Sequence, residues 1–412
     1  MALIINKKLG DDVPHRIMQY HGQSYSDTYV TDMTDYIVRS TNDKPNAHTF
    51  GLEIECTKLD SAITNEELEK MFELFPYMQA ARDGSVPSNV SGSAVELTTV
   101  PMTPEAWKES GFKELLTYMR EHEFKAYCVT NTDDPSVSVG CGGHIHINKG
   151  DDWEEVVALM AMFIDQNKHA VQMIAHRDFT YYAQNNLASL NKSNKRYSLE
   201  YIKGYVLSNR GVHENALNLQ HSASIEFRLP VGTLDYELKM SHIEFLNNLY
   251  NCCDDVVHGR ARIDRLTINK VCKDGDFLPA YMNELGLSCS KKLLILDKEI
   301  KAKIDAYNVD KCKVVKALSE LQLAIAMTNA SDIRQGSINT ITRHFNDITG
   351  ASNIDSEMYY LKNLKDQRVI SQGLDQYTES HNDAVTKAYK KLKDILASVV
   401  IPQVYEDMKG EK

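Results

Sequence analysis

The chain has 412 residues, of which 42% are hydrophobic and 25% charged, and its formal net charge is −11. A chain of this length can bury a sizeable core without disulfides or a structural metal, either in two or three domains or in one large domain with extensions. The negative charge argues against general nucleic-acid binding, because proteins of that class are usually basic. A nucleotide or nucleic-acid substrate held by a local basic patch remains compatible with it.

The eight cysteines are scattered and none forms a CxxC pair, so zinc-ribbon and thioredoxin-like sites have no support. Cys252 and Cys253 lie in an apolar stretch, where buried free thiols are the expectation. No apolar run approaches the eighteen residues of a membrane span, and the apolar run at the N-terminus is too short for a signal peptide. We therefore expect a protein of the cytoplasm, which is a reducing compartment, with no membrane partner.

Residues 1–47 are polar and weakly patterned, and we interpret them as an N-terminal extension. The first clear strand is predicted over 48–56, where apolar residues alternate with Gly51, Glu53 and Glu55. The elements predicted after it, in chain order, are a helix over 65–75 capped by Thr64 or Asn65, a strand over 94–100, a helix over 104–122, a strand over 128–130, a strand over 138–147 with a glycine-rich entry, a helix from 151 or 152 to about 174, a strand over 223–231, and a helix ending near 251.

The pattern from about residue 285 to 412 is helical almost throughout. We therefore divide the chain into the extension, a catalytic core over 48–258 and a mainly helical C-terminal module over 259–412. Single helices alternate with strands through the middle of the core, and this order would also fit a parallel α/β sheet. The pattern alone leaves the direction of the strands open.

Three predicted strands carry charged or metal-competent residues at positions i and i+2, and a fourth carries one. These residues are the pairs Glu53/Glu55, His144/His146 and Glu226/Arg228, and the single Glu96. Because side chains at i and i+2 of a strand point to one face, each pair shares a face, with Cα atoms about 6–7 Å apart. If the strands form one sheet, its charged face needs cations, since unpaired charges on a covered face are costly. Magnesium suits such a face because it combines carboxylates with phosphate oxygens.

Each pair also has a purely structural interpretation. Glu-x-Glu is common on the solvated face of a sheet, and Glu226 with Arg228 could form a simple cross-strand salt bridge. The glycines around Cys141 form no P-loop, because no Gly-Lys-Ser/Thr follows them, and Cys141 is better explained as a small strand residue than as a nucleophile. No single pair therefore indicates a functional site, but the occurrence of all of them in one chain does.

Taken together, the motifs resemble the amidoligase family of the glutamine synthetase and glutamate–cysteine ligase superfamily. The similarity covers roughly residues 48–255, and each piece is short but stands in the family's order. The pieces are Phe50-Gly-Leu-Glu-Ile-Glu55, Asp83-Gly-Ser85, Val95-Glu-Leu97, Gly142-Gly-His-Ile-His146, Arg177 with Tyr181 and Tyr182, Ile225-Glu-Phe-Arg-Leu-Pro230, and Gly232-Thr-Leu234.

This resemblance implies an α+β fold with a glutamine synthetase-like, curved and mostly antiparallel sheet, helices on one face, and ATP with two or more Mg²⁺ ions on the concave face. Mn²⁺ is the alternative ion. The residues that correspond by position to metal ligands are Glu53, Glu55, Glu96, His144 and Glu226. His146 and Arg228 correspond to phosphate-contacting residues, Ser85 joins them in cofactor binding, and Arg177 corresponds to an arginine that binds phosphate or a substrate carboxylate. Arg228, Arg177 and His146 are the catalytic residues on this basis.

The activity implied is that of an ATP-dependent carbon–nitrogen ligase, which joins a small-molecule or peptide carboxylate to an amine through an acyl phosphate. Family members are often multimeric, so a homo-oligomer is one expectation. The helical module after residue 260 has no recognised counterpart, and the identity of the substrates stays open. Two alternatives remain on this evidence: a metal-dependent hydrolase or nuclease that uses the same Glu/His cluster, and a catalytically silent binding protein on the same core.

Overall fold

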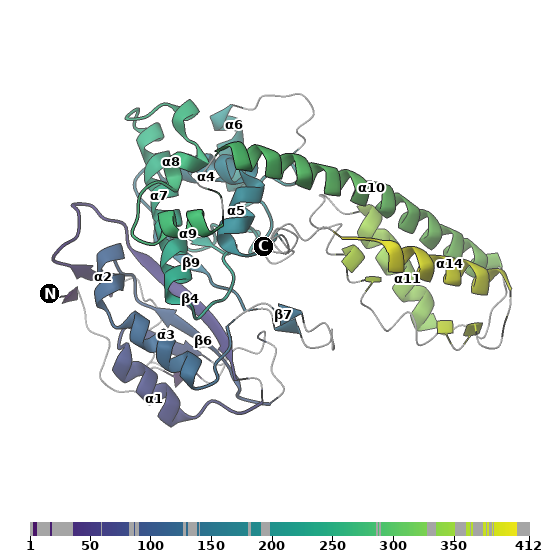
Figure 1. Cartoon of the computed structure of the whole chain (residues 1–412), viewed down its shortest axis with the longest axis horizontal. Coiled ribbons are helices and arrows are strands. Elements are labelled where there is room, and N and C mark those ends of the chain that lie inside the picture. Colours follow the sequence, from purple (N-terminus) through teal and green to yellow (C-terminus); the bar gives the residue numbers. More distant parts are fainter. Residues whose placement is uncertain are drawn as a thin grey trace. The chain divides into compact units, whose positions relative to one another are not determined.

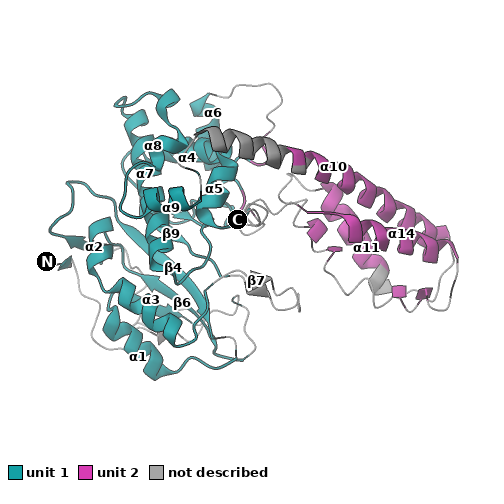
Figure 2. Cartoon of the chain, in the orientation of Figure 1, with its two compact units in different colours: residues 1–178, 185–187, 192–290 teal, residues 179–184, 188–191, 291–412 magenta. Residues whose placement is uncertain are grey.

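The chain forms two compact units, which are coloured separately in Figure 2. The first consists of Met1–Asp178, Asn185–Leu187 and Lys192–Ser290, and the second of Phe179–Gln184, Ala188–Asn191 and Lys291–Lys412. The computed structural model describes residues 3–5, 17–18, 36–58, 60–81, 86, 90–126, 129–130, 138–139, 141–179, 183–190, 198–285, 287, 290–327, 335–350, 360–362, 364–365, 374–375, 377–378, 381 and 383–401.

A seven-stranded sheet forms the centre of the first unit (Figure 1). Its strands, in spatial order, are β10 (Leu217–Asn218), β11 (Ser224–Phe227), β9 (Ile145–Asn148), β4 (Phe50–Thr57), β6 (Ala94–Thr99), β5 (Met78–Ala81) and β2 (Ile17–Met18). All pairings from β10 to β5 are antiparallel, and β2 is parallel to β5. The fold is therefore α+β, and the parallel arrangement that the sequence pattern also allowed is excluded.

Two short pairings involve segments outside this sheet. Strand β1 (Leu3–Ile5) pairs antiparallel with β3 (Val38–Ser40), and β7 (Val129–Thr130) pairs antiparallel with β8 (Ser138–Val139). Together with β2, β1 and β3 show that described parts of the N-terminal extension add strands to the first unit.

Helices pack on the apolar face of the central sheet. On α2 (Pro104–Glu109), the buried Trp107 donates its indole N–H to the carbonyl oxygen of Phe50 in β4 at 3.1 Å. On α7 (Tyr236–Val257), Phe245 lies against Phe227 of β11, with ring centroids 6.2 Å apart. The strand residues that alternation assigned to this face, such as Ile54, are buried, as the removal of apolar surface from water requires.

Helices predicted as continuous are divided in the structure. The helix expected over 104–122 is α2 followed by α3 (Phe112–Glu121), and Gly111 between them has φ +83°. A Cβ at Gly111 would lie 2.6 Å from the carbonyl oxygen of Leu74, at the end of α1 (Asn65–Leu74). Only glycine combines this backbone conformation with such a close approach. The helix expected from 152 to 174 is likewise α4 (Trp153–Gln166) and α5 (Lys168–Ala175), which are separated at Asn167.

The predicted strand over 138–147 also divides. Its first part is β8 and its last part is β9, so only the second part belongs to the central sheet. Residues 141–144 connect to β9 and bridge to the segment after β11 through Gly142 and Val231. The glycine-rich entry is therefore not part of a strand, and an isolated bridge joins it to the segment after β11.

Short helices complete the first unit, one of them before β10 and the others beyond residue 258. They are α6 (Leu199–Ser208), the 3-10 turn Ile263–Arg265, α8 (Ile268–Val271) and α9 (Leu278–Glu284). The side chain of Asn248 on α7 donates to the carbonyl oxygen of Val271 at 3.0 Å. Contacts of this kind attach the segment after α7 to the first unit, which extends to Ser290.

The second unit is helical and has its own core. Its long elements are α10 (Ser290–Met327), α11 (Gln335–Gly350) and α14 (Ala384–Ser398). The buried residues of this core include Tyr307, Leu318, Leu321, Ile341, Val385 and Leu392. The helical character expected of the C-terminal region is confirmed. Within the described ranges, no helix is both long enough and apolar enough to cross a membrane.

The carboxylate of Glu244 fixes the start of α9. Its Oε1 accepts the backbone N–H of Asp276 at 2.9 Å, and its Oε2 accepts those of Phe277 and Leu278 at 3.0 and 2.8 Å. These donors belong to the first residues of the helix and to the two that precede it, where backbone N–H groups lack intrahelical partners. A single side chain of α7 therefore satisfies three such groups and joins α9 to the sheet-covering helix.

We predict that Glu244→Gln lowers the free energy of unfolding by about 1–3 kcal/mol, because one carboxylate oxygen is replaced by an NH₂ group that cannot accept a hydrogen bond. Urea unfolding followed by circular dichroism measures the change. The exposed Glu69→Gln in α1 is the matched control and should stay within about 0.5 kcal/mol of the parent chain. Equal stability of the two variants would contradict the structural role given to Glu244.

Candidate functional site

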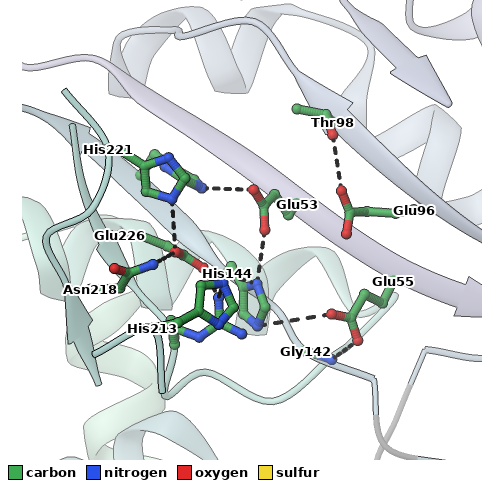
Figure 3. Close-up of polar contacts among 12 residues, drawn as sticks. Glu53, Glu55, Glu96, Thr98, Gly142, His144, His213, Asn218, His221 and Glu226 are labelled. Atoms are coloured by element: carbon green, nitrogen blue, oxygen red, sulfur yellow. Dashed lines mark hydrogen bonds and ion pairs between the residues drawn. The ribbon is translucent and has the colours of Figure 1, made fainter. Parts of the chain in front are cut away.

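Strand register brings the predicted charged residues together on one face of the sheet. Glu226 of β11 lies directly opposite His146 of β9, and Glu55 of β4 lies opposite Glu96 of β6. Strand β9 also pairs with β4, where His146 is opposite Gly51. The absence of a side chain at Gly51 leaves room on this face beside His146. Figure 3 shows the resulting cluster of carboxylates and imidazoles, which come from neighbouring strands and point toward one another.

Glu53 connects the two histidines of β9. Its Oε2 lies 2.9 Å from Nδ1 of His144, and its Oε1 lies 3.0 Å from Nε2 of His146. Burial alone would raise the pKa of the Glu53 carboxyl, but the charge and hydrogen bonds of the two imidazoles hold this pKa well below its usual range. Burial would lower the pKa of His146, and the neighbouring Glu53 carboxylate raises it above the ordinary value. Each group therefore stabilises the charge of the other.

Glu226 is the most deeply buried carboxylate of the cluster, with a side chain that is 1% exposed. Its Oε1 lies 3.1 Å from Nδ1 of His144 and accepts a hydrogen bond from Nη1 of Arg228. Its Oε2 accepts from Nδ2 of Asn218 at 2.6 Å and lies 3.1 Å from Nε2 of His221. Burial would raise the pKa of this carboxyl, yet the hydrogen bond from His221 and the nearby imidazoles lower it to about 2.

The glycine-rich segment holds the remaining carboxylate. The backbone N–H of Gly142 donates to Oε2 of Glu55 at 2.6 Å. The next residue, Gly143, donates its N–H to the carbonyl oxygen of Pro230 at 3.1 Å. A Cβ at Gly143 would lie 2.4 Å from the carbonyl oxygen of Val231 and 2.7 Å from Nζ of Lys239. The close backbone approach expected of these glycines is therefore present, and it places an N–H donor on Glu55.

The predicted site residues occupy different positions relative to this cluster. Those in mutual contact are Glu53, His144, His146, Glu226 and Arg228, with Glu55 attached through Gly142 and 4.0 Å from Nε2 of His144. Glu96 is buried, and its Oε1 accepts a hydrogen bond from the hydroxyl of Thr98 at 3.3 Å. Arg177 is half-buried, and its Nη1 donates to the carbonyl oxygen of Arg228 at 3.4 Å. Ser85, Tyr181 and Tyr182 lie outside the described residues.

Two overlapping groups of side chains have the composition of a metal site. One consists of Glu53, His144 and Glu226, and the other of His146, His221 and Glu226. Within each group the candidate ligand atoms lie within 4.8 Å of one another. Carboxylate oxygens and imidazole nitrogens are the ligands that divalent cations take in proteins, so the donor set fits a divalent ion.

Several residues near the cluster carry no signal in the sequence. Asn218 belongs to the two-residue strand β10, and His213 and His221 come from the loops before and after it. A strand this short has no recognisable periodicity in the sequence. His213 contacts the guanidinium of Arg228, with 3.4 Å between Nε2 and Nη1. The side chains of His213 and His221 are exposed, unlike that of Glu226. Their position at the charged face depends on the path of the loop, which sequence alternation does not encode.

Lys239 is a buried cation that the sequence pattern also failed to identify. Its side chain on α7 is 0% exposed, and among the described residues its Nζ has no hydrogen-bond partner. Burial lowers the pKa of Lys239 to about 8, and the Glu55 carboxylate opposes this change. A lysine at this depth costs stability, because the protein interior solvates an ammonium poorly. In the sequence, Lys239 resembles the solvated face of an amphipathic helix.

Comparison with known proteins adds no assignment. No protein-family model matches this chain, and no curated protein matches its sequence.

We predict that Lys239→Met raises the free energy of unfolding at pH 7, by up to about 3 kcal/mol, because an apolar side chain of similar size replaces a poorly solvated charge. The folded-state pKa of about 8 lies below the ordinary 10.5. Between these two values the unfolded chain binds more protons than the folded chain, so the parent protein gains stability as the pH rises. The advantage of the variant should therefore shrink between about pH 8 and 10.

Urea unfolding at pH 7 and at about pH 9.5 tests this pair of expectations. The exposed Lys270→Met serves as the control and should change stability by less than about 0.5 kcal/mol at either pH. A Lys239→Met protein that is less stable than the parent at pH 7 would show that the ammonium is favourably bound.

Proposed function

We propose that the chain is an ATP-dependent carboxylate–amine ligase on a core of the glutamine synthetase and glutamate–cysteine ligase type, as the resemblance to amidoligases implies. The observation that supports this proposal is the gathering of Glu53, His144, His146, Glu226 and Arg228 on one face of an antiparallel sheet whose other face is apolar. Curvature of the sheet, with ATP on its concave face, belongs to the same proposal.

Metal ions are expected to bind at the carboxylates of this face. Glu53, His144 and Glu226 would hold one ion, and Mg²⁺ is the first expectation, with Mn²⁺ as the alternative. Bound divalent ions supply charge neutralisation and orientation for the phosphate oxygens of ATP. Rigid strands suit this task, because side chains on paired backbone hold their separation better than side chains on loops.

Arg228 and Arg177 would act on the transferred phosphoryl group. The guanidinium of Arg228 lies beside the carboxylates, and the guanidinium of Arg177 donates to the backbone carbonyl oxygen of Arg228. A guanidinium is planar and presents donors in a fork that fits phosphate oxygens, which an ammonium cannot reproduce. Cations in this position would stabilise the negative charge that develops during phosphoryl transfer.

The reaction proposed has two steps. A substrate carboxylate oxygen attacks the γ-phosphorus of ATP, the bond to the bridging oxygen breaks, and ADP leaves. An amine then attacks the acyl carbon of the acyl phosphate, loses a proton, and displaces inorganic phosphate to give an amide or isopeptide. The cations of the charged face would stabilise the first step, because the triphosphate carries its negative charge during phosphoryl transfer.

A metal-dependent hydrolase is the second candidate, and the imidazoles favour it. A divalent ion bound by two histidines and a glutamate is a common donor set of hydrolytic zinc centres. The two functions differ in their requirement for nucleotide. A ligase releases ADP only with both co-substrates, whereas a hydrolase needs the ion and water alone.

We predict that ATP with Mg²⁺ or Mn²⁺ raises the melting temperature and that EDTA abolishes the increase. At about one hundred times the dissociation constant, a ligand specific for the folded state stabilises by about 2.7 kcal/mol. Differential scanning fluorimetry measures the change, with each metal alone and ATP alone as controls. An equal increase with ATP in EDTA would contradict a metal-bridged nucleotide site.

We further predict that Glu53→Gln reduces ADP release by at least about a hundredfold, in line with the loss of one preorganised group at a developing charge. The assay uses a panel of carboxylates with hydroxylamine, which converts an acyl phosphate to a hydroxamate that can be measured. Glu69→Gln is the control and should retain the parent rate. Hydroxamate formation by Glu53→Gln at the parent rate would remove Glu53 from the site.

A further inference from the structure

The Oε1 and Oε2 atoms of Glu226 point toward different sets of neighbours. Oε1 faces His144 and Arg228, whereas Oε2 faces Asn218 and His221. The carboxylate therefore lies between His144 on one side and His221 on the other (Figure 3). A carboxylate in this position can contribute one oxygen to each of two adjacent ions.

The group on the Oε2 side differs in composition from the group on the Oε1 side. It contains the imidazoles of His146 and His221 and the single carboxylate of Glu226, whereas the other group contains two carboxylates and one imidazole. The rings of His146 and His221 meet edge to face, with centroids 4.8 Å apart. Two nitrogen donors and one oxygen donor suit a borderline-soft ion, because Mg²⁺ prefers oxygen ligands and gives up its water reluctantly.

Neighbouring side chains hold two of these ligands in place. Nδ1 of His146 lies 3.1 Å from the hydroxyl of Ser224, which leaves Nε2 of the ring toward the cluster. Nδ2 of Asn218 donates to Oε2 of Glu226 at 2.6 Å. Outer hydrogen bonds of this kind orient metal ligands and are typical of built metal sites.

Solvent access is also suitable for an ion. The side chain of His221 is 42% exposed, that of His146 is 17% exposed and that of Glu226 is 1% exposed. One side of the group is therefore open to solvent, while its carboxylate is anchored in the interior. An open side leaves room for water or a substrate atom as a further ligand, as in sites with three protein ligands.

We propose that His146, His221 and Glu226 form a second metal site that selects a divalent transition-metal ion over Mg²⁺. His146 then acts as a metal ligand as well as a neighbour of Glu53. The site requires no nucleotide, so its existence can be tested independently of the proposed ligase reaction. In the ligase, its ion would sit beside the ion held by Glu53 and His144, joined to it through Glu226.

Metal titration of the full chain tests this proposal. The protein is stripped with EDTA, desalted, and titrated with Mn²⁺, Co²⁺ or Mg²⁺ in a calorimeter, and the visible absorption of bound Co²⁺ reports nitrogen ligation. We expect this site in the parent protein to bind a single ion. In separate titrations, Co²⁺ and Mn²⁺ should each bind there at least about tenfold more tightly than Mg²⁺. Mg²⁺ affinity equal to that of Mn²⁺ and Co²⁺ at every site would overturn the selectivity.

Two variants of one residue separate ligation from structure. His221→Ala and His221→Asn should each weaken Co²⁺ binding at this site by at least about tenfold, since loss even of outer-shell partners costs about 10–100-fold. The asparagine variant retains a donor for Glu226, so it guards against an effect of misfolding. His213→Ala, an imidazole of the same loop that contacts Arg228 instead, should bind Co²⁺ like the parent. Unchanged Co²⁺ affinity and spectrum in both His221 variants would refute the site.

The outcomes also distinguish this site from the proposed reaction. Selective Co²⁺ binding that depends on His221, with no effect of ATP on melting, would support the metal site and contradict the ligase. An ATP response that needs Mg²⁺, with no loss of Co²⁺ binding in the His221 variants, would contradict the metal site and leave the ligase proposal in place.

Discussion

The side chain of Glu226 is only 1% exposed, and its lowered pKa keeps it charged. A charge at this depth requires hydrogen-bonding partners around it. Among its partners, Arg228 directly follows β11 and His144 directly precedes β9, whereas Asn218 belongs to β10 and His221 to the loop after it. An isolated carboxylate at this depth would cost several kcal/mol. The positions of β9, β11 and the loop before β11 therefore depend on one another, because each provides a group that the buried carboxylate needs.

The two faces of the central sheet obey different physical constraints. The apolar face removes hydrophobic surface from water under α2, α3 and α7, and it provides most of the free energy that holds the sheet together. The charged face gains little from burial and is held by hydrogen bonds between carboxylates and imidazoles. These hydrogen bonds give the face a defined geometry before any cation binds, which is the preorganisation that electrostatic catalysis uses.

Lys239 is a second kind of buried charge, because it belongs to helix α7 and not to a strand of the charged face. Its ammonium, carried by α7, lies close to Gly143, and the charge of the Glu55 carboxylate opposes the lowering of its pKa by burial. Sequence periodicity could not find this residue, because a lysine on a helix is usually solvated. The exposed imidazoles of His213 and His221 were missed for a different reason: they belong to a loop, and loops carry no repeating pattern from which a face can be assigned.

Much of the secondary structure could be predicted from the local sequence pattern. Alternation correctly assigned the faces of β4, β6, β9 and β11, because successive side chains of a strand point to opposite sides whatever the strand pairs with. The local pattern did not predict the helix breaks. Gly111, between α2 and α3, has a positive φ and lies so close to the carbonyl oxygen of Leu74 that a side chain would not fit, and that contact is long-range. The strand expected over 138–147 was divided for a similar reason, since residues 141–144 bridge to the segment after β11.

Local sequence pattern was enough to assign the residues that share a face: Glu53 with Glu55, His144 with His146, and Glu226 with Arg228. Backbone geometry repeats every two residues in a strand, so this information is local. The three-dimensional fold was needed to show that these faces meet, that Glu226 lies opposite His146, and that His221 completes a second group of candidate ligands. Register and loop path depend on contacts between residues far apart in the chain, and the free energy of those contacts has no signature in a single sequence.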